Sequence, residues 1–159
     1  MDEARKRELE QLLAQKAQKD TQAKHEEDRA KAKQEGFRTQ FAGVATTVIE
    51  PVLREFEQTV KGNGFTTEVG FEKRSNGYDR VYLYILPSGH TPERYPENRR
   101  MAIFRAEVHA ERVAYFDNTI KNLGGESFPD GDYALSQITR EKVEELVFAY
   151  VKRIMAKAG

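Results

Sequence analysis

The large apolar residues of this chain are confined almost entirely to residues 37–159, and this asymmetry constrains the fold more than any other feature. Before Gly36, the apolar side chains larger than alanine are those of Met1, Leu9, Leu12 and Leu13. From Phe37 onward, phenylalanine, tyrosine, valine, isoleucine and leucine recur in every segment. Because a domain folds around a buried apolar core, we expect residues 1–36 to form a separate arm and residues 37–159 to form the domain.

The arm is rich in residues that favour helices. Alanine, glutamine, glutamate, lysine and arginine dominate it, and neither proline nor glycine occurs before Gly36. Oppositely charged residues such as Asp20 and Lys24 lie four positions apart, and each such pair stabilises a helix by roughly 0.2–0.5 kcal/mol. We therefore expect a long, charged N-terminal helix. Gly36 marks a hinge after it, or the helix continues through Gly36 at a cost of about 1 kcal/mol.

No continuous apolar stripe runs along this helix. Leu9 and Leu13 lie four residues apart, but Lys16, Asp20 and Glu27 occupy the positions that would extend the stripe. A stable coiled coil needs three or four heptads with apolar seam positions. Three interpretations stay open: a solvated helix, a helix that docks on a partner or a second copy, and a helix that binds nucleic acid. If the helix docks on a partner or a second copy, Leu9 and Leu13 are its candidate interaction residues.

A wide apolar stripe predicts the first core helix, from about Arg38 to Gln58. The apolar residues that recur there at spacings of three and four are Phe37, Phe41, Val44, Ala45, Val48, Ile49, Val52, Leu53, Phe56 and Val60. Pro51 has no N–H to donate to the carbonyl of Thr47, so we expect a kink there or two shorter helices that meet end to end. Glycines at positions 62 and 64 predict its end.

Alternating apolar and polar residues predict an antiparallel meander of four to five strands. The pair Asn76 and Gly77 favours a two-residue hairpin turn between strands at Phe65–Lys73 and Tyr78–Leu86. Further strands are expected at Met101–Val108, at Val113–Asp117 and, as a short edge strand, at Tyr133–Ile138. Strands joined by short turns are antiparallel, which makes the fold class α+β.

A C-terminal helix is expected to begin after Thr139, which is a good N-cap. It packs with the core helix on one face of the meander and so leaves the other face of the sheet uncovered. We expect Tyr82, Tyr84 and Phe104 to form an aromatic surface there for a partner or a second subunit. In the alternative, these rings are divided between the core and the surface.

The sequence contains no motif specific for catalysis, metal binding or nucleotide binding. It has no cysteine, and His25, His90 and His109 share no metal-ligand spacing, so we expect neither a metal nor another cofactor. The charged first residues do not resemble a signal peptide, and no apolar run is long enough for a membrane helix. We therefore expect a cytoplasmic protein that does not use a membrane.

Arginines gather on the proline-rich loop that precedes the third strand and on the strand itself. A histidine and a tyrosine lie among them. The full set is His90, Arg94, Tyr95, Arg99, Arg100, Arg105 and Arg112. Guanidinium groups with an interleaved aromatic ring can hold phosphates and stack on bases. Four glutamates share this stretch and the 26 basic residues of the chain equal its 26 acidic ones. Mixed surface charge and a salt-bridged protein contact are therefore alternatives to an anion or nucleic-acid site.

These observations favour a non-enzymatic protein-interaction or oligomerisation module, adaptor-like in character, that uses the arm and the sheet face. The alternative is a nucleic-acid-binding protein that uses the arginine-rich loop and the adjacent strand. An enzyme acting through His90, Tyr95, Arg99 and Arg100 comes third, because no active-site signature supports it.

Overall fold

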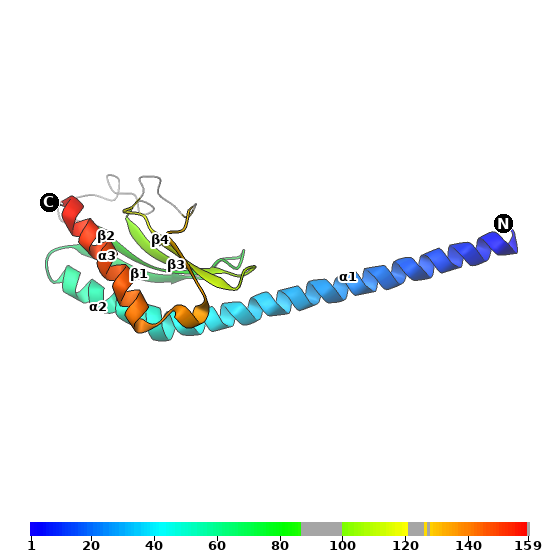
Figure 1. The fold of residues 1–159 in the computed structure, drawn as a ribbon, viewed down its shortest axis with the longest axis horizontal. Coiled ribbons are helices and arrows are strands. Elements are labelled where there is room, and N and C mark those ends of the chain that lie inside the picture. The colour runs from blue at the N-terminus through cyan, green and yellow to red at the C-terminus, as the bar shows by residue number, and fades with distance from the viewer. Residues whose placement is uncertain (87–99, 121–125, 127, 159) are drawn as a thin grey trace. The chain divides into compact units, whose positions relative to one another are not determined.

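The computed structural model describes residues 1–86, 100–120, 126 and 128–158 (Figure 1). Its internal contacts divide the chain into two compact units, Met1–Gly36 and Phe37–Gly159. The second unit contains a five-stranded antiparallel sheet and a C-terminal helix, so the expected α+β fold is confirmed.

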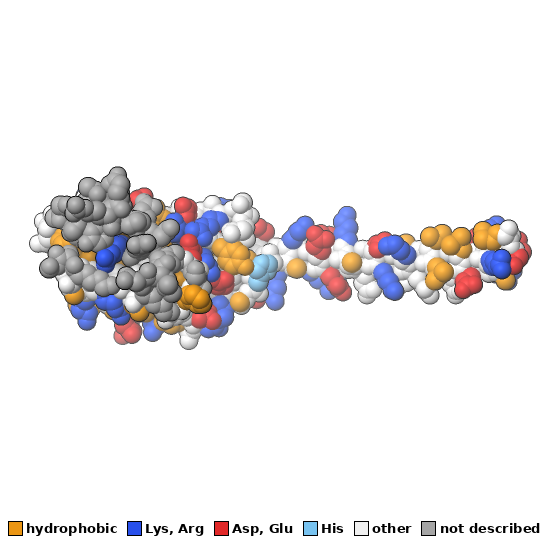
Figure 2. All heavy atoms as spheres, turned by 90° about the horizontal axis from the view of Figure 1, so that it is seen from above, with side chains coloured by type: hydrophobic (Ala, Val, Ile, Leu, Met, Phe, Trp, Pro, Cys, Tyr) orange, Lys and Arg blue, Asp and Glu red, His pale blue; other side chains and the backbone are white. Residues whose placement is uncertain are grey.

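The first unit is helical throughout and belongs to helix α1, Glu3–Val44. Asp2 caps this helix, because its Oδ1 accepts a hydrogen bond from the backbone N–H of Arg5 at 2.7 Å. Gly36 is itself helical, so the helical backbone is not interrupted there. Residues 1–33 are all exposed, and Figure 2 shows side chains of both charges along the unit with hydrophobic ones gathered near its N-terminal end. This unit buries no apolar stripe of its own.

A π-helical turn, Ala45–Ile49, joins α1 to α2, Glu50–Lys61. The sequence predicts a kink at Pro51 or two shorter helices that meet, and the structure has two helices with the irregular turn just before the proline. The N–H of Glu50 donates to the carbonyl of Ala45, five residues back. Pro51 lies in the first turn of α2, the position in a helix where proline is best tolerated.

The sheet is a meander in which every strand pairs with its neighbours in the sequence. Its strands are β1 Thr66–Glu72, β2 Arg80–Leu86, β3 Met101–Glu107, β4 Arg112–Asp117 and β5 Gly131–Tyr133. The strand expected at Tyr133–Ile138 is wrong beyond Tyr133. The N–H of Ala134 donates to Oε1 of Gln137 at 2.8 Å and turns the chain into a 3-10 helix, Leu135–Gln137.

The β1–β2 hairpin is confirmed, but the two-residue turn expected at Asn76 and Gly77 is wrong. Glu72 pairs with Arg80, so residues 73–79 form the loop. The carboxylate of Asp79 organises this loop. Its Oδ1 accepts the backbone N–H of Arg74 at 2.8 Å, and its two oxygens accept Nε and Nη2 of Arg38 at 3.0 and 2.9 Å.

Helix α3, Arg140–Ala158, packs with α2 on one face of the sheet (Figure 1). Thr139 is its N-cap, as predicted, and accepts the backbone N–H of Lys142 at 3.2 Å. The side chain of Tyr115 fixes α3 to the sheet, because its hydroxyl donates to the carbonyl of Leu146 at 3.2 Å. A further tie is the ion pair between Arg153 and the buried Asp117. These contacts hold α3 in place beside α2.

The face of the sheet turned away from the helices is not the open surface that we expected. Tyr84 is only 6% exposed and belongs to a second apolar cluster with five other buried residues. Those residues are Leu86, Met101, Ile103, Ala114 and Phe116. The second cluster therefore makes this an internal face over much of β2, β3 and β4.

Candidate functional site

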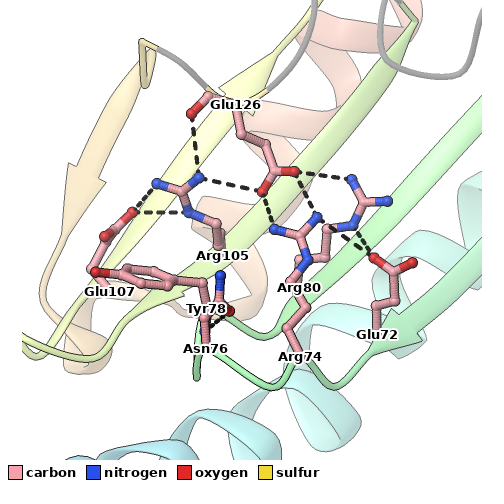
Figure 3. Close-up of polar contacts among 8 residues, drawn as sticks. All are labelled: Glu72, Arg74, Asn76, Tyr78, Arg80, Arg105, Glu107 and Glu126. Atoms are coloured by element: carbon pink, nitrogen blue, oxygen red, sulfur yellow. Dashed lines mark hydrogen bonds and ion pairs between the residues drawn. The ribbon is translucent and has the colours of Figure 1, made fainter.

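Charged residues occupy the other part of the same sheet face. The strand register places Glu72, Arg80 and Arg105 side by side across β1, β2 and β3. Glu126 completes this group, which we call the Glu126 cluster together with Arg74 and Glu107 (Figure 3).

The Glu126 carboxylate binds three guanidinium groups. It accepts hydrogen bonds from Arg74 at 3.0 and 2.7 Å, from Arg80 at 3.3 Å and from Arg105 at 3.4 Å (Figure 3). Burial by itself raises the pKa of Glu126, but the hydrogen bond from Arg74 and the charges of the three arginines outweigh it, so that the pKa lies below its usual value. Glu126 is therefore held as a carboxylate.

The remaining members neutralise the cluster. Nε of Arg80 lies 2.5 Å from Oε2 of Glu72, and Nε of Arg105 donates to Oε1 of Glu107 at 3.0 Å. Three arginines thus meet three glutamates. The guanidinium of Arg105 also lies 4.7 Å from the ring centroid of Phe116, which joins the charged part of the face to the apolar part. The cluster is a satisfied salt-bridge network that ties Glu126 to the sheet.

The structure does not bring the predicted arginine set together as a free cationic surface. His90, Arg94, Tyr95 and Arg99 lie outside the described residues. Arg105 belongs to the Glu126 cluster, and Nε of Arg112 lies 2.8 Å from Oδ1 of Asp132 on β5. The backbone carbonyl of Arg100 accepts the hydroxyl of Tyr150. Arg105 and Arg112 therefore each face a carboxylate.

The five interaction candidates fall in two different environments. Leu9 and Leu13 are 44% and 59% exposed, as an interaction surface requires. Tyr84 is buried in the second cluster, and the half-buried Tyr82 donates from its hydroxyl to Oε1 of Glu68 at 3.1 Å. Phe104 is fully buried on the helix side of the sheet. The three aromatic rings do not form the exposed surface that we expected.

A surface that the sequence did not predict lies between α2 and α3. These helices border a groove of about 640 Å³, which we call the α2–α3 groove. The residues that line it are Glu55, Phe56, Thr59, Val60, Glu141, Glu144, Glu145, Phe148 and Val151. Its most exposed apolar member is Phe148, at 54%, and the rings of Phe56 and Phe148 are 6.5 Å apart between centroids. The groove therefore offers an aromatic surface to solvent.

The rim of the groove is acidic. Four of its lining residues are glutamates, and none of the described lining residues is basic. Arg140 bridges two of them, because it pairs with Glu55 and its Nε lies 2.9 Å from Oε1 of Glu144. The hydrogen bond from Arg140 lowers the pKa of Glu55, so that carboxylate is charged at neutral pH. Lys152 is not a lining residue, but its Nζ lies 4.9 Å from the ring centroid of Phe148.

The sequence held one signal for this groove. The buried stripe of α3 is Val143, Val147, Tyr150 and Ile154, and Phe148 lies beside this stripe rather than in it. A large aromatic outside the buried stripe of a helix is a candidate contact residue. Phe56 gave no such signal, because its spacing fits the core stripe of α2.

The described residues contain neither a group of three or more potential metal ligands nor a helix long and apolar enough to cross a membrane. No protein-family model, curated protein or solved structure matches this chain.

Proposed function

We propose that this protein is a non-enzymatic protein-interaction module whose binding surface is the α2–α3 groove. The observation that carries the proposal is Phe148, an aromatic side chain 54% exposed in a groove between two core helices. Aromatic residues in concave apolar surfaces are the typical anchors of protein interfaces. A partner that covers Phe148 removes apolar area from water, which is the main favourable term in association.

The chemistry of the groove defines the kind of partner. A groove between two helices is suited to an amphipathic helix, which inserts its apolar side chains between them. Because Glu55, Glu141, Glu144 and Glu145 line it, lysines and arginines that flank the apolar side chains of the partner would be attracted to the rim. We therefore expect the partner to be a basic amphipathic helix.

The nucleic-acid alternative has less support from the described residues. Arg105 and Arg112 are each paired with a carboxylate, and phosphate binding would have to displace that carboxylate. The Glu126 cluster likewise contains as many acidic as basic side chains. Neither Arg105 nor Arg112 therefore offers positive charge that favours nucleic-acid binding over the groove.

A set of three synthetic helical peptides tests the proposal. All carry leucines at positions i, i+3, i+4 and i+7, and their flanking residues are lysine in one peptide, glutamine in the second and glutamate in the third. Fluorescence anisotropy with the full chain should give the order lysine, glutamine, glutamate, with the first dissociation constant on the order of 10 μM. Failure of all three peptides to bind at about 1 mM would refute the proposed function.

A further inference from the structure

We infer that the groove is occupied by the N-terminal arm of a second copy of this chain. This inference rests on the proposed function and specifies the partner. The docking segment is the leucine face, which we define as Leu9, Leu12 and Leu13. These side chains are 44%, 56% and 59% exposed, and all lie on α1.

The leucine face has the geometry of a short docking element. Successive residues of an α-helix are separated by about 100°, so Leu9, Leu12 and Leu13 fall within an arc of about 100°. The face is only one turn long, because Lys16, Asp20 and Glu27 interrupt any continuation. One turn is too short for a stable coiled coil between two arms. The leucine face is shorter than the groove, which residues 55–60 of α2 and residues 141–151 of α3 line.

The charges of the two surfaces are complementary. Arg5, Lys6 and Lys16 lie on the same side of α1 as the leucine face, by the same helical spacing, and so do Asp2 and Asp20. Arg5 and Lys16 pair with Asp2 at 3.9 Å and with Asp20 at 3.2 Å. These pairs are exposed and therefore weak, so the basic side chains can exchange partners. Of the rim glutamates, Glu55 and Glu144 pair with Arg140 and Glu145 pairs with Lys142, and these surface pairs are weak as well, so the rim can exchange partners with the arm. Two grooves facing each other would instead bring like charges together.

The exposed apolar residues of the chain indicate that the helix bound in the groove comes from a second copy. The large apolar side chains that the described residues leave exposed are Met1, Leu9, Leu12, Leu13, Ile120, Phe128 and Phe148. Among them, the leucine face is the group of neighbouring side chains on one helix, and Phe148 is the exposed aromatic of the groove. The arm buries nothing of its own, so docking supplies the burial that its helix lacks. Such a contact joins two different surfaces and closes into a dimer when it is reciprocal.

Light scattering of the full chain tests this inference with matched variants. The mass of the native chain should rise above that of the monomer between about 1 μM and about 100 μM, the range expected for a small interface. Leu12→Glu and Phe148→Glu should each shift the dissociation constant at least tenfold upward. Gln11→Glu is the control, since it adds the same charge to the same turn on the opposite side of α1.

The outcomes separate this inference from the proposed function. A native chain that stays monomeric at about 100 μM but binds the lysine peptide overturns the second copy as partner and leaves the proposed function standing. Self-association that Leu12→Glu and Phe148→Glu leave unchanged, or that Gln11→Glu weakens equally, also overturns the inference. A monomer that binds no peptide refutes both.

Discussion

Replacement of Phe148 by alanine isolates the contribution of the aromatic ring to binding. The residue is 54% exposed, and a phenylalanine offers about 200 Å² for burial, so a partner can cover about 110 Å² of it. At about 25 cal/mol per Å², this area contributes about 2.7 kcal/mol, or about 100-fold in the dissociation constant. Because alanine keeps its β-carbon, we expect Phe148→Ala to weaken binding of the lysine peptide by roughly 30- to 100-fold.

The assay is an anisotropy titration of the full chain, with thermal unfolding as a check that the domain remains folded. Phe128→Ala provides the matched control, because Phe128 is 63% exposed and does not line the groove. It should bind the peptide as the native chain does. A loss below about threefold in Phe148→Ala, or an equal loss in Phe128→Ala, would contradict the assignment of the groove.

Three further predictions concern the charged residues. Asp79→Ala should reduce the free energy of unfolding in urea by about 3–5 kcal/mol, because it removes the carboxylate that pairs with the largely buried Arg38. Asp132→Ala removes an exposed ion pair and should cost at most about 1 kcal/mol. Equal losses would contradict the account of the 73–79 loop. The pKa of Glu126 is lowered on folding, so its stabilisation is present above its usual pKa of 4.5 and is lost as the pH falls through the lower folded value. The difference in unfolding free energy between the native chain and Glu126→Gln should therefore shrink below pH 4.5, and a difference that grows there would be the wrong sign. Titrations with single- and double-stranded DNA and RNA at two salt concentrations should reveal no salt-dependent affinity tighter than about 100 μM, and a tighter one would favour the nucleic-acid alternative.

Local sequence patterns predicted most of the elements because those elements depend on local burial. The alternation in β2 separates Val81, Leu83 and Ile85 from Tyr82 and Tyr84, and the two sets belong to different clusters in the structure. The β1–β2 turn could not be predicted in this way. Its conformation depends on the contact between Arg38 and Asp79, which are 41 residues apart in the sequence.

The placement of Phe104 shows a second limit of pattern analysis. Strand β3 is apolar at Met101, Ala102, Ile103 and Phe104 alike, so alternation does not tell which set faces the helices. The register with β2 decides it, since Phe104 pairs with Val81 on the helix side. Tyr84, on the opposite face, is buried by the second cluster, which no local pattern revealed.

The α2–α3 groove was missed because it depends on the packing of two helices that are distant in the sequence. Phe56 follows the spacing of the core stripe, and only the position of α3 makes its ring part of the lining of a groove. Leu9 and Leu13, by contrast, are interaction candidates from the sequence alone, because no regular stripe accounts for them, and their role in binding stays a prediction. Local sequence therefore indicates the leucine side of the proposed contact but not the groove.

Photo-crosslinking from the arm tests the central claim most directly. A benzophenone side chain would replace Leu12, and isotopically light and heavy chains would be mixed before irradiation and mass spectrometry. The account predicts cross-links from position 12 of one chain to groove residues such as Thr59 or Phe148 of the other, with light and heavy peptides joined. Cross-links only within one chain, or only between two arms, would contradict it.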